Sequence, residues 1–109
     1  MKQNPNWRRY EMQAQVIAAL AHPIRIAIAD LLKGGEVCVC EIAERIGAER
    51  SNTSRHLAIM LKAGVLKTRK DGLQVFYSLQ TPCALSFLNC ATQTLERNLK
   101  EQADALART

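Results

Sequence analysis

The sequence lacks the features of a membrane or secreted protein. No apolar run in its 109 residues approaches the length needed to cross a bilayer, and Met1 to Asn6 is polar, without the apolar core of a signal peptide. We therefore expect a cytoplasmic protein with no membrane partner. In a reducing cytoplasm the four cysteines are not expected to form a structural disulfide framework, which leaves metal binding, redox sensing or burial for them.

The motifs of common enzyme classes are missing as well. The sequence contains no Ser-His-Asp set, no phosphate-binding loop and no Cys-x-x-Cys pair. A chain of this length builds a modest core without a large enclosed cleft. No internal repeat, low-complexity tract or linker divides it. We expect a single domain over residues 1–109 that is not an enzyme and holds no permanently bound cofactor.

An excess of basic residues points to an anionic partner. Fifteen Lys and Arg against ten Asp and Glu give a formal net charge of +5, which favours nucleic acid over a membrane surface. Charge alone does not separate a DNA-binding protein from a basic soluble one, so the pattern of structural elements has to decide.

Apolar residues recur at helical spacing through the first two-thirds of the chain. His22-Pro23 fits a proline in the first turn of a helix, and glycines follow each of the next three helical patterns. The sequence predicts four helices here: about Trp7 to Leu20, Ile24 to Lys33, about Cys40 to Ile46, and Ser51 or a neighbour to Ala63.

A β-hairpin and a last helix complete the predicted order. The alternating runs Val65 to Arg69 and Leu73 to Leu79 flank Lys70-Asp71-Gly72, a typical hairpin turn. The last helix begins near Thr81-Pro82 and continues to about Ala107. The predicted fold is mostly α with a β-hairpin wing, the winged helix-turn-helix.

The start of the fourth predicted helix is dense in hydrogen-bonding groups. In a helix-turn-helix the second helix enters the major groove with its N-terminal residues toward the bases. Serine, threonine and asparagine reach phosphates and base edges, arginine grips guanine, and the basic hairpin tip suits phosphate or minor-groove contacts. We therefore predict double-stranded DNA as the partner, contacted by Arg50, Ser51, Asn52, Thr53, Ser54, Arg55, His56, Arg69 and Lys70.

Cys38 and Cys40 are separated by one residue, Val39. In a helix, positions i and i+2 point about 200° apart, whereas in an extended segment they point to the same side. We expect the two sulfurs to diverge at the start of the third helix, so that they chelate one ion only when its first turn unwinds. The positive helix end also favours the reactive thiolate, and soft ions such as trivalent arsenic prefer thiolates.

The sequence resembles the ArsR/SmtB family of metal-responsive repressors over nearly its whole length. The Cys-Val-Cys run is typical of the arsenic-type and cadmium-type branches. The resemblance implies a homodimer, formed here by the terminal helices, a palindromic operator, and release of DNA when the effector binds. The matching segments are Leu20–Arg25, Glu36–Ile42, Ser54–Val65, Arg69–Gly72 and Tyr77–Leu79.

The resemblance leaves the third thiol ligand open. Arsenic-type members often carry a third cysteine where this sequence has Ala43, and the aspartate of the family's zinc site is replaced by Thr81, with no histidine later in that helix. Cys83 and Cys90 share a helix face but lie about 10.5 Å apart along it, too far to hold one ion together. For Cys83 burial is favoured over ligation. We predict Cys38, Cys40 and Cys90 as ligands, with Cys83 or solvent as alternatives.

We therefore expect a repressor that releases operator DNA on binding As(III) or Sb(III). A Cd(II)- or Pb(II)-responsive repressor is one alternative. The other is a redox or reactive-sulfur switch in which Cys38 or Cys40 forms a disulfide or polysulfide with Cys90. A metalloid sensor responds under full reduction and a redox sensor does not.

Overall fold

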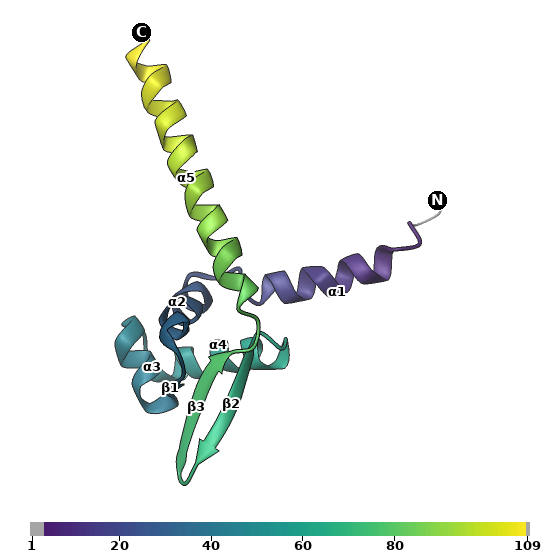
Figure 1. Cartoon of the computed structure of the whole chain (residues 1–109), viewed down its shortest axis with the longest axis vertical. Helices are drawn as coiled ribbons and strands as arrows, with labels where there is room; N and C mark the ends of the chain where they lie inside the picture. Colours follow the sequence, from purple (N-terminus) through teal and green to yellow (C-terminus); the bar gives the residue numbers. More distant parts are fainter. Residues whose placement is uncertain (1–3, 109) are drawn as a thin grey trace.

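The computed structural model describes residues 4–108, and its element order confirms the mostly helical prediction with a wing (Figure 1). The helices and strands follow one another as α1 (Trp7–Ala18), α2 (Pro23–Leu31), a 3₁₀ turn η1 (Leu32–Gly34), β1 (Val37–Cys38), α3 (Val39–Ile46), α4 (Arg50–Lys62), β2 (Leu66–Asp71), β3 (Gln74–Leu79) and α5 (Cys83–Ala107).

A small core joins α2, α3 and α4 to the base of the wing. The largest fully buried side chains come from each of these parts: Ile28, Ile42, Leu57, Met60 and Val65. Full burial of such a side chain contributes about 1.5–3 kcal/mol. The core therefore fixes the angle between α3 and α4, the two helices of the predicted reading module.

Local chemistry sets the helix ends. His22 caps α2, because its Nδ1 accepts a hydrogen bond from the Ile24 amide at 3.1 Å, and Pro23 occupies the first turn. Gly47 ends α3 with φ of 76°, a left-handed conformation that favours glycine. The first helix ends at Ala18, slightly before the predicted Leu20, and α3 begins one residue earlier than predicted.

A strand that the sequence analysis missed lies beside the wing. β1, β3 and β2 form one antiparallel sheet in that order, in which Val37 pairs with Tyr77 and Cys38 with Phe76. β1 is only two residues long and pairs with a distant segment, so the sequence shows no alternation of apolar and polar residues that would predict a strand there. Its presence attaches the cysteine segment directly to the wing.

The two terminal helices project away from the core (Figure 1). The radius of gyration is 17.7 Å, against about 13 Å for a compact chain of this length. None of the α1 residues is buried. Along residues 4–108 no single helix is long and apolar enough to span a membrane, although α1 and the Pro23–Gly34 segment pass that test as a pair bent by 74°.

Candidate DNA interface and thiol site

The exposed face at the start of α4 is polar. Arg50, Ser51, Ser54 and Arg55 are exposed, and the Arg55 guanidinium donates a hydrogen bond to Asn52 Oδ1. Glu49, Ser51, Asn52 and Arg55 line an open recess of about 380 Å³. This face offers donors and acceptors of the kinds that contact base edges and phosphates.

Two predicted DNA contacts lie on the opposite face of α4. Thr53 and His56 are only 2% and 8% exposed, because they share the inward face of the helix with Leu57 and Met60. Thr53 Oγ1 and His56 Nδ1 have no hydrogen-bond partner within residues 4–108. Burial in this conformation excludes both side chains from the surface that DNA could reach, which corrects that part of the prediction.

His56 packs on His22 of the α2 cap. The ring centroids are 4.2 Å apart with an angle of 34° between the planes. Burial lowers the pKa of His56, and His22, Arg25 and Arg55 lower it further by charge repulsion. The pair joins the start of α2 to the middle of α4, and its contacts favour a neutral His56.

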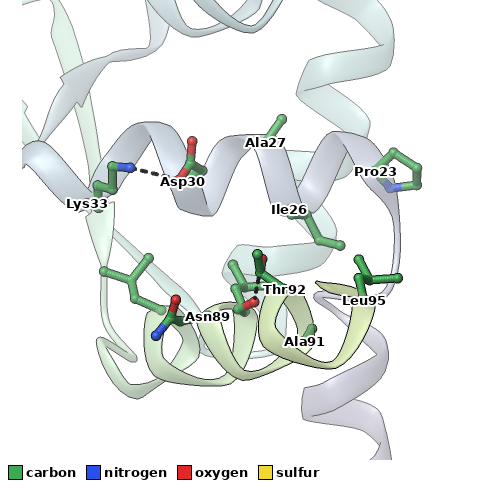
Figure 2. Close-up of a pocket in the computed structure, with 11 residues that line it drawn as sticks. Pro23, Ile26, Ala27, Asp30, Lys33, Asn89, Ala91, Thr92 and Leu95 are labelled. Carbon is green, nitrogen blue, oxygen red and sulfur yellow. Dashed lines mark hydrogen bonds and ion pairs between the residues drawn. The ribbon is translucent and has the colours of Figure 1, made fainter. Parts of the chain in front are cut away.

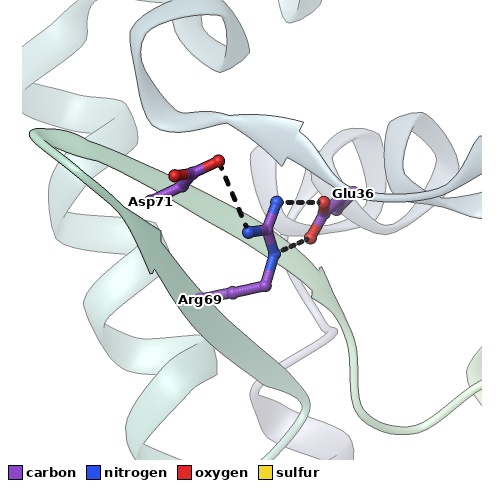
Figure 3. Close-up of polar contacts among 3 residues, drawn as sticks. All are labelled: Glu36, Arg69 and Asp71. Carbon is purple, nitrogen blue, oxygen red and sulfur yellow. Dashed lines mark hydrogen bonds and ion pairs between the residues drawn. The ribbon is translucent and has the colours of Figure 1, made fainter.

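The wing places its two predicted contacts in different surroundings. Lys70 is exposed near the tip. The Arg69 guanidinium instead grips Glu36, with Nη2 2.6 Å from Oε1 and Nε 3.1 Å from Oε2, while Nη1 lies 3.8 Å from Asp71 Oδ2 (Figure 3). It also lies over the Phe76 ring, 4.8 Å from the centroid. The Glu36 contact lowers the pKa of the carboxyl and raises that of the guanidinium.

The two thiols of the Cys38–Cys40 segment, which we call the thiol turn, adjoin each other. Cys38 ends β1 and is the N-cap of α3 with extended backbone, φ of −63° and ψ of 137°. Cys40 stands in the first turn of α3. Cys38 is buried and Cys40 exposed. A hydrogen bond between the thiols is the main cause that raises the pKa of Cys40, followed by burial and by the charges of Cys38 and Glu41.

These observations correct two expectations about the thiol turn. Cys38 lies outside the helix with extended backbone, so the opposed geometry of two positions within one helix does not describe this pair. The pKa of Cys40 is raised rather than lowered, because its thiol neighbour outweighs the helix end.

A shallow cavity connects the thiol turn to α4. It has a volume of about 240 Å³ and is lined by Val39, Cys40, Ala43, Arg50, Thr53, Ser54 and Leu57. Cys40 and the exposed residues at the start of α4 thus border the same space. A group attached to the Cys40 sulfur would stand beside the polar face of α4.

The remaining cysteines lie on α5. All four cysteines are free, and Cys83 and Cys90 are exposed in the single chain, so the burial expected for Cys83 is not found there. Within residues 4–108, no group of three His, Cys, Asp or Glu side chains could hold a metal ion. The structure brings Cys38 and Cys40 together but does not assemble the predicted three-cysteine set within one chain.

Apolar surface is concentrated on α1 and α5. Large exposed side chains follow both helices: Trp7, Tyr10, Met12, Val16 and Ile17 on the first, and Phe87, Leu95 and Leu99 on the second. A groove of about 750 Å³ runs between α2 and α5, with Ile26 facing Leu95 across it (Figure 2). Such apolar helix faces are typical of surfaces that associate with another chain.

Sequence comparison identifies relatives among bacterial regulators. Residues 22–68 match the family model of the bacterial regulatory protein arsR family. The uncharacterised HTH-type transcriptional regulator Rv0081 of Mycobacterium tuberculosis is 35% identical over 98 residues, covering 89% of this chain and 86% of the relative. A Staphylococcus aureus cadmium resistance transcriptional regulatory protein, a CadC homolog, is 40% identical over 67 residues, covering 61% of this chain and 55% of the relative.

Solved structures share the fold. The crystal structure of Rv0081 superposes with a TM-score of 0.76 at 33% identity, covering 93% of this chain and 99% of that one. A homodimeric winged helix-turn-helix DNA-binding domain from Mycobacterium bovis matches with a TM-score of 0.75 at 24% identity, over 91% of this chain and 93% of that one. These matches confirm the winged helix-turn-helix.

Proposed function

The chain belongs to the arsR family of bacterial transcriptional regulators, and from this premise we propose that it is a repressor that a thiophilic ion releases from its operator. The effector is As(III) or Sb(III), bound by Cys38 and Cys40. The observation that carries the proposal is the placement of two thiols at the junction of β1 and α3, between the wing and the reading module.

The proposed DNA interface combines α4 with the wing. Arg50, Ser51, Asn52, Ser54 and Arg55 enter the major groove from the start of α4, which is the geometry of a helix-turn-helix reader. Lys70 contacts the phosphate backbone from the wing.

The proposed repressor is a homodimer. One reading helix serves one half-site, so a palindromic operator requires two copies related by a dyad. The exposed apolar faces of α1 and α5, including Leu95 and Leu99, form the interface between the copies. The groove between α2 and α5 continues this surface (Figure 2).

Arsenite reacts with neutral thiols, so a raised pKa at Cys40 does not prevent binding. Arsenous acid, As(OH)₃, and two thiols give a bis-thiolate arsenic hydroxide and two molecules of water, in which two As–S bonds replace two As–O bonds. The third position keeps the hydroxyl or takes Cys90 or Cys83 of the second copy. Arsenic held between Cys38 and Cys40 stands at the end of β1 and beside the cavity that Arg50 and Ser54 line.

Two routes then lead from the ion to the DNA. Moving Cys38 disturbs the junction between β1 and α3, and the group bound at Cys40 presses on the start of α4 through the shared cavity. Both routes change the reading face without unfolding the core around Ile42 and Leu57.

Cd(II) is the second candidate effector, favoured by the similarity to the CadC homolog. Thiolate ligands suit cadmium and lead as well as arsenic, but these ions take three or four sulfurs, and residues 4–108 of one chain assemble no such set. A redox or reactive-sulfur response needs Cys38 or Cys40 to reach Cys90, and of these three Cys40 and Cys90 are exposed.

One titration separates these effectors. A palindromic duplex, selected by the protein from a random pool, is labelled and its binding followed by fluorescence anisotropy under full reduction. Arsenite, antimonite, Cd(II), Pb(II) and an organic polysulfide are added in parallel. We expect arsenite and antimonite to release the DNA, and Cys40→Ser to abolish release. Release by the polysulfide alone, or by arsenite from the Cys40→Ser protein, would overturn the proposal.

A further inference from the structure

We infer that Glu36 is a positioning residue that couples the thiol turn to the wing through Arg69, and that Arg69 serves as this tether rather than as a DNA contact. The inference rests on the proposed function, because it concerns how the effector signal reaches the wing. It assigns a role to the Glu36–Arg69 pair that differs from the backbone contact expected for Arg69 from the sequence.

The thiol turn and Arg69 lie on the same line across the sheet. Cys38 pairs with Phe76 between β1 and β3, and Phe76 pairs with Arg69 between β3 and β2. Three neighbouring strands thus connect the buried thiol to the guanidinium. Adjacent strands lie about 4.8 Å apart, so this connection spans about 10 Å of hydrogen-bonded backbone.

Side-chain contacts also connect these three strands, on one surface of the sheet. The Arg69 guanidinium forms two hydrogen bonds to Glu36 (Figure 3). It also stacks over the Phe76 ring, and Glu36 lies two residues before Cys38. A planar guanidinium held by a carboxylate fork and an aromatic face has one preferred orientation. The start of β1 is therefore connected to β2 in two ways: through the backbone hydrogen bonds of β3, and directly through the Glu36–Arg69 side chains.

This arrangement leaves Arg69 poorly suited to bind phosphate. Each of its three guanidinium nitrogens faces a carboxylate oxygen, at 2.6 and 3.1 Å on Glu36 and 3.8 Å on Asp71. Two carboxylates face this one guanidinium, so less of its positive charge is available to a phosphate. Lys67 and Lys70 are exposed on the same strand, and neither has a carboxylate at hydrogen-bond distance within residues 4–108.

The tether makes the position of the wing depend on the thiol turn. When an ion draws Cys38 and Cys40 into one coordination sphere, the backbone of residues 36–40 shifts, and Glu36 moves with it. Arg69 follows its carboxylate, and β2 carries Lys70 away from the DNA backbone. Without the tether, the thiol turn could move while the wing stayed in place.

Glu36→Gln tests this coupling, with Asp71→Asn as the matched control. Both changes remove one negative charge beside the same guanidinium, but only Glu36 connects to the thiol turn. The measurement is the ratio of operator dissociation constants with and without arsenite, together with arsenite stoichiometry from sulfur–arsenic absorption. We expect a wild-type ratio of about 5–150-fold, a ratio near one for Glu36→Gln, and the wild-type ratio for Asp71→Asn.

Arg69→Lys and Arg69→Gln distinguish a tether from a phosphate contact. Lysine keeps the charge but loses the bidentate, stacked geometry, so it should preserve operator affinity and lower the arsenite ratio. Glutamine should leave the salt dependence of DNA binding unchanged. A phosphate contact would instead lower the slope by about 0.9 for each arginine lost. The double variant Glu36→Gln/Arg69→Lys should lose no more coupling than either single variant.

The outcomes separate this inference from the function on which it depends. Absence of arsenite release in the wild type would refute the proposed function. Two results would refute the tether alone, provided that arsenite releases the wild-type protein. One is a wild-type ratio of operator dissociation constants in Glu36→Gln. The other is a reduced salt dependence of DNA binding in Arg69→Gln. Equal loss in Glu36→Gln and Asp71→Asn would show a general effect of charge and would also refute it.

Discussion

Replacing Cys38 and Cys40 by serine, one at a time, should distinguish their structural contributions from their shared role in effector binding. The two thiols adjoin each other but differ in exposure, since Cys38 is only 7% exposed and Cys40 is exposed. Serine substitutes a strongly polar hydroxyl for a weakly polar thiol. That change is costly where the group is buried and nearly neutral where water reaches it.

The magnitudes follow from burial. A buried hydroxyl without a full set of hydrogen bonds costs about 1–3 kcal/mol in proteins, whereas an exposed substitution usually stays within about 0.5 kcal/mol. A domain near this size loses about 4 °C in melting temperature per kcal/mol. Cys38→Ser should therefore melt about 4–12 °C lower than the wild type, and Cys40→Ser within about 2 °C of it.

The assay is thermal unfolding followed by far-ultraviolet circular dichroism, under reduction and at one fixed protein concentration. The concentration must match because association shifts the melting temperature. Cys38→Ala, which adds no hydroxyl, measures the cost of lost volume separately. Both serine variants should bind operator at a temperature well below melting and should fail to respond to arsenite. Equal melting temperatures for the two, or a wild-type arsenite response in either, would refute the reasoning.

Three further outcomes are expected. The lowered pKa of His56 means that the folded chain binds fewer protons than the unfolded chain, so the free energy of unfolding should fall as the pH drops through 6.5. Urea titrations at pH 5.5 and 7.5 measure this dependence, and His56→Gln should flatten it. Leu95→Glu should give a monomer in sedimentation velocity while the same change at the wing-tip Leu73 leaves the dimer intact, and equal behaviour would place the interface elsewhere. Arg55→Ala should cost about 1–3 kcal/mol in operator binding and blur sequence preference, whereas Lys70→Ala should weaken all duplexes alike; unchanged affinity for Arg55→Ala would exclude α4 as the reader.

The helices were predictable because their signals are local. Proline and histidine at the start of α2, and glycine at the end of α3, act within a few residues of the boundary that they set. The wing was also readable from two alternating runs around a turn. These features depend on short stretches of chain, which a single sequence displays in full.

The parts that were missed depend on contacts between distant segments. β1 forms only because Cys38 meets Phe76, and Glu36 meets Arg69 33 positions later. The backbone of Cys38 is set by that strand, so the placement of both cysteines relative to one helix could not be predicted without it.

The inward face of α4 did carry a signal that could have been used. Thr53, His56, Leu57 and Met60 recur at intervals of three, one and three, the spacing of a buried helix face. The polar identities of Thr53 and His56 drew attention to DNA instead. Spacing should have outweighed residue type at these two positions.

The exposed apolar faces of α1 and α5 have a consequence for gene dosage. If two chains must pair through these faces before either reading helix meets a half-site, operator occupancy depends on the square of the chain concentration wherever the chain is mostly unpaired. Halving the supply of newly made chain then lowers occupancy about fourfold at low occupancy. Under the proposed pairing, the apolar surface on the terminal helices makes repression respond steeply to the amount of chain that is produced, independently of any effector.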